Sequence, residues 1–416
     1  MKEFFFICGL SLLPLGVSAN SILISGADVY SSAGVLARTS VYIEDGVIRA
    51  LGDSVPDSAD MQIDAAGKSI TAGLFNASTH LGAVEVGMID ETVDFFSENP
   101  AVTASFKIAD AFNPQSTLIP FNRVHGLSHA LLVPEAGSHL FAGQVALVQL
   151  GNRPVVINDS VAVAVDYTES GFELAHSSRA TAMAMLRQAL TDALDFAANK
   201  AAALAGDRRD YSLSLADLAA LEPVINGYKP LLVRTHRASD IGQILRLAAE
   251  YKLQLILSGV SEGWMVAEQI AAANVPVIID PIANLPASFE SLGARLDNAK
   301  LLSDAGVKLV FTGMSWLRTH NAYLVRQSAG NAVANGLDKG VAIAAMTYNP
   351  ANLFASNVSG DIVLGAVADL VLWSGDPLEL TSEPDLVMIG GEVISLESRS
   401  LQLRDRYYKR LQKSSP

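Results

Sequence analysis

Two histidines in this sequence each follow an apolar, strand-like segment. His80 comes after "SITAGLFNAST" (residues 69–79), and His236 ends "PLLVRTH" (residues 230–236). An imidazole can bind a divalent cation or donate a hydrogen bond inside a pocket. Because both histidines stand at matched positions after apolar segments, we expect them to act as a pair, either as weak metal ligands or as hydrogen-bond donors.

Acidic residues also follow the strand-like segments. A catalytic zinc site needs about three protein ligands plus a water, so two histidines alone are too few. The acids at predicted strand ends are Glu135, Glu169, Glu262 and Asp280. For each of them, a solvated loop position or the first turn of a helix is the more common role. By their strand-end positions, Glu169 and Asp280 are the candidates for a catalytic general base.

The remaining histidines give weaker signals. His139 stands in the glycine-bearing loop "PEAGSHLFAGQ", a position compatible with contact to a substrate. His320 follows the last predicted strand, where it either contacts a substrate or has a loop or helix-cap role. We interpret the others as structural or surface residues: His125, His129 and His176. The sequence has no Gly-x-Ser-x-Gly elbow and no phosphate-binding glycine loop.

Seven short apolar segments predict the strands that would position these residues. They are 69–75, 127–135, 161–167, 230–236, 253–259, 275–280 and 307–313. Helical patterns such as 239–251 and 262–273 separate the later segments. Strands buried on both faces that alternate with helices are typical of a parallel sheet. Residues 69–355 therefore predict a (β/α)8 TIM-like barrel, although the pattern does not place its remaining strand.

The segments on either side of the barrel have a different pattern. Residues 20–68 and 361–396 contain short alternating runs separated by turns such as Asp45-Gly46, which is typical of antiparallel hairpins. We therefore predict an α/β fold in which both chain termini form a small β-sandwich domain beside the barrel. Residues 397–416 are left as a C-terminal tail.

The first 19 residues have the pattern of a secretory signal peptide. They predict a mature protein that begins near Asn20 and is periplasmic or secreted. Cys8, the only cysteine, lies in this segment, so the mature protein would have no thiol chemistry. The formal net charge of -14 argues against nucleic acid and anionic membranes as partners. We expect a small-molecule substrate, with a homo-oligomer or a complex with a paralogue as possible assemblies.

Several of these segments together resemble a known family. The arrangement of "VYIEDGVIRALGD" and "ITAGLFNASTHLG", followed by "TYNPANLFA" and "GAVADLVLWSGDPLEL", is similar to the amidohydrolase superfamily, in particular its imidazolonepropionase-like branch. The resemblance covers essentially the whole mature chain. It implies a barrel plus a β-sandwich built from both termini. It also implies one or two divalent metals at the barrel mouth, whose bound water attacks a carbon–nitrogen bond.

The chain departs from the ligand set that this resemblance implies. The first strand of the family ends Asp-x-His-x-His, and the matching positions here are Asn76, Ser78 and His80. His236 fits the third histidine, but the segment 258–262 lacks the next one. The last strand ends in Gly313-Met314-Ser315 without the expected aspartate. As bridging carboxylates, only Asp166 and Glu169 are present near the matching strand end.

These departures give two hypotheses. The first is metal-dependent hydrolysis of a carbon–nitrogen bond in a cyclic or linear amide, by a copy that is weakly active or inactive. His80 and His236 would hold at most one weakly bound zinc or manganese ion. The second is a non-catalytic binding or assembly partner of an intact paralogue.

Overall fold

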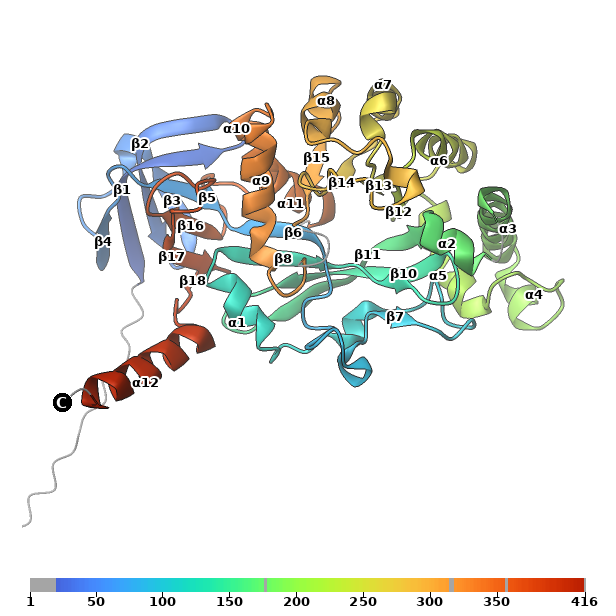
Figure 1. The fold of residues 1–416 in the computed structure, drawn as a ribbon, viewed down its shortest axis with the longest axis horizontal. Helices are drawn as coiled ribbons and strands as arrows, with labels where there is room; N and C mark the ends of the chain where they lie inside the picture. The colour runs from blue at the N-terminus through green and yellow to red at the C-terminus, as the bar shows by residue number, and fades with distance from the viewer. Residues whose placement is uncertain (1–19, 176–177, 314–317, 356–357, 415–416) are drawn as a thin grey trace, which may run out of the picture.

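The computed structural model describes residues 20–175, 178–313, 318–355 and 358–414. Figure 1 shows a barrel with surrounding helices, made from the middle of the chain, beside a β-rich domain made from both ends. The predicted signal segment, His176, Met314 and Ser315 lie outside the described residues.

The barrel sheet has eight strands in the order β15-β14-β13-β12-β11-β10-β8-β6. Their bounds are β6 Leu74–Thr79, β8 Leu127–Leu132, β10 Phe141–Gln149, β11 Val155–Asp166, β12 Leu231–Thr235, β13 Leu255–Gly259, β14 Val277–Ile279 and β15 Leu309–Phe311. Thr312 links the two edge strands, because its hydroxyl donates to Oδ1 of Asn76 (2.9 Å) and to the carbonyl of Ser78 (3.1 Å). The sheet is therefore nearly closed.

Strand β10 is the strand that the sequence pattern did not place. It pairs antiparallel with both β8 and β11, whereas the other neighbouring strands pair in parallel. A short turn at residues 150–154 joins β10 to β11, and so short a connection can link only antiparallel neighbours. The predicted barrel with a β-rich domain is confirmed, with one reversed strand as its departure from an all-parallel sheet.

Successive side chains of a strand point to opposite faces of the sheet, and this alternation determines which residues lie inside the barrel. One apolar residue from each of five consecutive strands packs into the interior cluster: Ala164, Leu232, Ile256, Ile278 and Val310. Side chains two residues apart in a strand share a face. The residues two positions further on are Asp166, Arg234, Ser258, Asp280 and Thr312. The carboxyl ends of the strands therefore form a polar mouth above an apolar interior.

Helices cover the outside of the barrel (Figure 1). Their bounds are α1 Leu118–Arg123, α2 Glu169–Leu174, α3 Arg179–Ala198, α4 Lys200–Leu204, α5 Leu215–Ile225, α6 Ala238–Tyr251, α7 Ala267–Ala272, α8 Asn298–Asp304, α9 Val325–Ala334, α10 Lys339–Ala345 and α11 Tyr348–Phe354. In α6, Ile241, Ile244 and Leu247 are buried on one face at helical spacing. The helices of the described ranges include none that has the length and apolarity needed to span a membrane.

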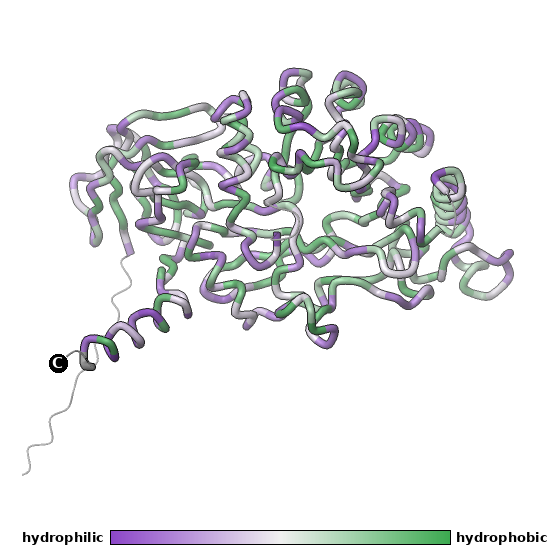
Figure 2. Tube along the Cα trace, viewed as in Figure 1, coloured by the Kyte–Doolittle hydropathy of each residue, from purple (hydrophilic) through white to green (hydrophobic). Residues whose placement is uncertain are grey.

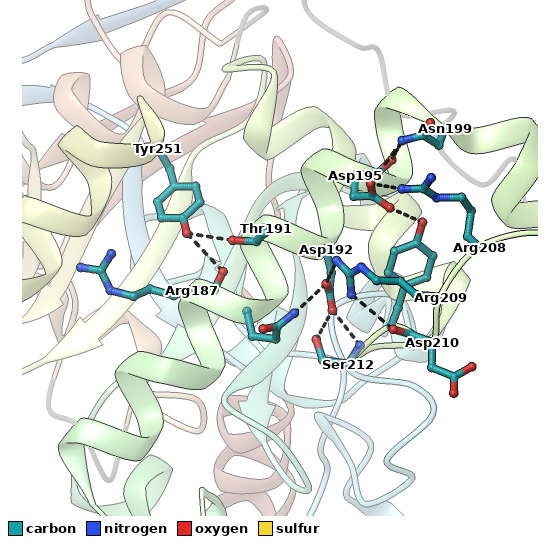
Figure 3. A network of polar contacts seen from close by, with 12 residues as sticks. Arg187, Thr191, Asp192, Asp195, Asn199, Arg208, Arg209, Asp210, Ser212 and Tyr251 are labelled. Atoms are coloured by element: carbon teal, nitrogen blue, oxygen red, sulfur yellow. Dashed lines mark hydrogen bonds and ion pairs between the residues drawn. The ribbon is translucent and has the colours of Figure 1, made fainter.

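A polar network fixes the loop that follows α4 against α3, as Figure 3 shows. The fully buried carboxylate of Asp192 accepts from Nη2 of Arg209 at 2.6 Å and from both the amide and the hydroxyl of Ser212 at 2.7 Å. One turn later, Asp195 accepts from the hydroxyl of Tyr211 at 2.8 Å. These bonds satisfy a buried charge that would otherwise destabilise the barrel wall.

The β-rich domain contains one eight-stranded sheet from both ends of the chain. Its strands are β1 Ser21–Ser31, β2 Gly34–Glu44, β3 Val47–Leu51, β4 Met61–Asp64, β5 Ser69–Ala72, β16 Leu370–Trp373, β17 Pro384–Ile389 and β18 Glu392–Val393. The antiparallel pairing of β16 with β5 joins the two ends. The hairpin turns at Gly46 and Gly391 touch, since a Cβ on Gly391 would lie 2.8 Å from Cα of Gly46.

The C-terminal tail contains a helix. Helix α12, Arg399–Ser414, projects away from the rest of the molecule in Figure 1. Figure 2 shows mainly hydrophilic residues along it, whereas the strands of both sheets are mostly hydrophobic. Leu401, Tyr408 and Leu411 are exposed on this helix.

Candidate active site at the barrel mouth

A cavity of ≈ 400 Å³ lies at the carboxyl ends of the barrel strands. Its volume is in the range of small-molecule sites, which span roughly 300–1,000 Å³. Polar side chains at its wall include all five that follow the apolar interior positions: Asp166, Arg234, Ser258, Asp280 and Thr312. Alternation along the strands therefore places the polar groups of the mouth.

His80 directly follows β6 and is 6% exposed. Its ring stacks on Phe95, with centroids 3.8 Å apart. Its Nε2 lies 3.4 Å from Nη2 of Arg318 and 3.6 Å from Oε1 of Glu135. Burial, and then the positive charge of Arg318, hold the pKa of His80 well below its usual 6.5. The imidazole is therefore neutral at physiological pH.

Arg318 places its guanidinium in front of the His80 ring nitrogen. Its Nη2 donates to Glu135 and lies beside His80, and the side chain lines the cavity with only 19% exposure. A divalent cation bound at Nε2 of His80 would meet this positive charge at close range. The guanidinium group of Arg318 therefore lies where a metal ion bound to His80 would have to lie.

His236 lies just after β12 and also lines the cavity. Its Nδ1 is 2.8 Å from the hydroxyl of Ser261. Gly259 packs against the ring, because a Cβ there would lie 2.7 Å from Cε1 of His236, and its φ of +90° also favours glycine. Burial, followed by the charge of Arg234, lowers the pKa of His236 to about 4.

The residues of the mouth do not fit the metal centre that the resemblance implies. Within the ranges that the structure describes, no group of three or more His, Cys, Asp or Glu residues could hold a metal. Residues 314–317 are Met, Ser, Trp and Leu, so they add no imidazole or carboxylate. Asn76, at the family's acidic position, instead donates to the carbonyl of Ala322 (2.8 Å) and accepts from Thr312. The predicted metal ligands His80 and His236 therefore belong to no such group in this part of the chain.

The predicted general bases, Glu169 and Asp280, both line the cavity. The amide of Glu169 donates to Oε2 of Glu290 at 2.9 Å, which places a third carboxyl group at the same wall. Glu290 is 5% exposed, and burial raises its pKa from 4.5 to about 7. A carboxyl group that titrates near neutral pH inside a cavity is suited to proton transfer.

The structure places the other candidates away from this wall. Nδ1 of His139 accepts from the amide of Phe141 (3.2 Å), and Nε2 of His320 lies 3.2 Å from the carbonyl of Glu85. Neither histidine is among the described residues that line the cavity. Glu262 accepts from the amides of Ala238 (2.9 Å) and Gly293 (3.2 Å), which is a structural role.

Sequence reasoning missed Arg234, Arg318 and Glu290. Alternation predicts that Arg234 faces the mouth, because Leu232 is an interior residue two positions earlier. Arg318 and Glu290 had no such signal, since they lie on connecting segments whose positions depend on the folded barrel.

Comparison with known proteins finds the same architecture. No protein-family model matches the chain. An amidohydrolase from Thermotoga maritima MSB8 is similar with a TM-score of 0.79 and 22% identity, covering 90% of this chain and 99% of that one. An adenosine deaminase from Xanthomonas campestris with bound zinc gives a TM-score of 0.51 and 16% identity, covering 94% and 98%. The chain has the amidohydrolase fold.

A short stretch of sequence agrees with this result. Over 72 residues the chain is 38% identical to a 5-methylthioadenosine/S-adenosylhomocysteine deaminase from Pyrococcus furiosus, and the match spans 17% of each chain. The resemblance to amidohydrolases is thereby confirmed, whereas the branch within them stays a prediction. The proteins that it resembles are named as an amidohydrolase and two deaminases.

Proposed function

We propose that the protein binds a small molecule with an amide-type carbon–nitrogen bond at the barrel mouth and hydrolyses this bond slowly, by proton transfer between side chains. The observation that carries this proposal is the cavity wall where the amide of Glu169 binds the carboxyl group of Glu290 at 2.9 Å. The amidohydrolase fold supports the choice of a carbon–nitrogen bond, because hydrolases with this fold act on such bonds.

Glu290 and a second carboxyl group have different proposed roles in proton transfer. Glu290, with a pKa near 7, holds a proton that it can donate to the leaving nitrogen as that nitrogen departs. Glu169 or Asp280 is the proposed general base, which accepts a proton from the attacking water. A pair of carboxyl groups that serve as general acid and general base is a recurrent catalytic arrangement. This route uses only side chains of the chain itself.

The test is turnover of cyclic amides and acyl dipeptides by purified protein, followed by mass spectrometry of the products. We expect slow hydrolysis that persists with a chelator present and falls at least about 100-fold in Glu290→Gln, in the range that a general acid contributes. Turnover that a chelator abolishes would contradict the side-chain route. The exposed Glu268→Gln variant is the matched control and should keep wild-type turnover.

A second candidate function, binding without turnover as a partner of an intact amidohydrolase, has its own support. Three large apolar side chains lie exposed near the cavity: Leu285 at 75%, Phe289 at 83% and Leu292 at 64%. Leu285 itself lines the cavity. A group of exposed apolar side chains is typical of a surface that binds another protein. Light scattering of wild type and Phe289→Ser would test it, with loss of a larger species in the variant as the expected result.

A further inference from the structure

Two arginines bring positive charge to the part of the mouth where a metal was expected. Arg234 lies on β12, lines the cavity and is 44% exposed at its side chain. Arg318 lines the same cavity, and its side chain is 19% exposed. The cavity therefore has a guanidinium group at two positions of its wall.

Within the described part of the chain, neither guanidinium group uses all of its N–H donors in hydrogen bonds to side chains. Arg318 uses Nη2 for both of its described contacts, with Glu135 and with His80. Nη1 of Arg234 is 3.9 Å from Oδ2 of Asp166, which exceeds hydrogen-bond distance. Oδ1 of Asp166 already accepts from the hydroxyl of Thr168 at 2.5 Å. A planar fork of donors is suited to a carboxylate.

We propose that Arg234 and Arg318 bind a carboxylate of the ligand, so that the cavity accepts amide compounds that carry a free acid. This rests on the proposed function and specifies its substrate class. The guanidinium groups take over the positive charge that a metal would have supplied, but they serve for recognition rather than for activation of water.

Three carboxyl groups of the cavity wall restrict the class of ligand further. Glu169, Asp280 and Glu290 line the same cavity as the arginines. These carboxyl groups can accept hydrogen bonds from an N–H donor, and those that are ionised repel a second negative charge. The favoured ligand therefore has one carboxylate and an amide or amine N–H, as in an N-acyl amino acid or a dipeptide.

The apolar part of the wall fits an aliphatic side chain. Val133, Ala142, Leu232 and Ile278 line the cavity beside the charged groups. Burying a leucine-sized side chain there contributes to affinity in proportion to the apolar area removed from water. N-acetyl-L-leucine has all the required groups and is a suitable probe.

The test compares N-acetyl-L-leucine with N-acetyl-L-leucinamide by titration calorimetry on the full-length mature protein. The two probes differ only at the carboxyl group. We expect the acid to bind about 10-fold or more tightly, because hydrogen bonds to a charged group are stronger than neutral ones. In Arg234→Gln this preference should be lost, and it should persist in Arg187→Gln, whose exposed arginine pairs with Glu250 on the outside.

Each outcome separates this inference from the proposed function. Equal binding of acid and amide, or an acid preference that survives in Arg234→Gln, would overturn the carboxylate site but leave amide binding standing. Binding of neither probe by the wild type would count against both. Arg318→Lys is the second variant, since it keeps a positive charge next to Glu135 and should weaken the acid preference without abolishing folding.

Discussion

Replacing Glu290 by glutamine tests whether the cavity wall holds a proton near neutral pH. The carboxyl group is 5% exposed and lies 3.9 Å from Nη2 of Arg179. Its pKa rises from 4.5 to about 7, chiefly through burial, and nearby Glu169 and Asp166 add to the increase. Glutamine has almost the same shape and can still accept from the amide of Glu169.

The magnitude follows from the difference between the two pKa values. The interval from 4.5 to about 7 is about 2.5 pH units, which at 1.36 kcal/mol per unit corresponds to about 3 kcal/mol. Because the pKa is raised in the folded protein, the stabilisation is fully present below pH 4.5. It is lost as the pH rises through 7.

Urea unfolding of wild type and Glu290→Gln at pH 4.5 and pH 7.5 measures this effect directly. We expect the wild type to lose about 3 kcal/mol more unfolding free energy than the variant between these two pH values. Groups that titrate in both proteins cancel in the comparison. Parallel stability curves for the two proteins would refute the buried, neutral carboxyl group.

Three further predictions concern two substitutions and the N-terminus of the mature protein. Gly259→Ala should destabilise the protein by about 2 kcal/mol in thermal unfolding, because its φ is +90° and its Cβ would meet the His236 ring; an unchanged melting temperature would contradict this packing. Asp192→Ala should cost about 2–3 kcal/mol in urea unfolding, since it leaves Arg209 and Ser212 without their acceptor, whereas the exposed Asp207→Ala should cost little. If the protein is exported, mass spectrometry should find a mature N-terminus near Asn20. Cytoplasmic protein with an intact Met1 would contradict this prediction.

The sequence predicted the repeating part of the fold and part of the site. Apolar runs that end in His80, His236 or Asp280 predicted parallel strands, because strands buried on both faces have few other patterns. Strand β10 was not predicted because no helix separates it from β11, whereas helices separate the later predicted strands. Residue type and strand-end position thus indicated residues that line the cavity, while their roles stay a prediction.

The chemistry of the site depends on contacts between distant residues. Arg318 meets His80 across 238 positions of sequence, and Glu290 meets Glu169 across 121. Neither pairing leaves a local pattern in the chain. The departure from the family pattern at Asn76 and Ser78 can be read from the sequence, whereas the position of Arg318 beside His80 depends on the folded barrel.

Metal content tests most directly whether the mouth is a side-chain site rather than a metal centre. Protein produced with added zinc or manganese, then dialysed, should retain well below one ion per chain by elemental analysis, because Arg318 lies 3.4 Å from the Nε2 atom of His80. One or more tightly held ions per chain in the wild type, lost in both His80→Ala and His236→Ala, would contradict it.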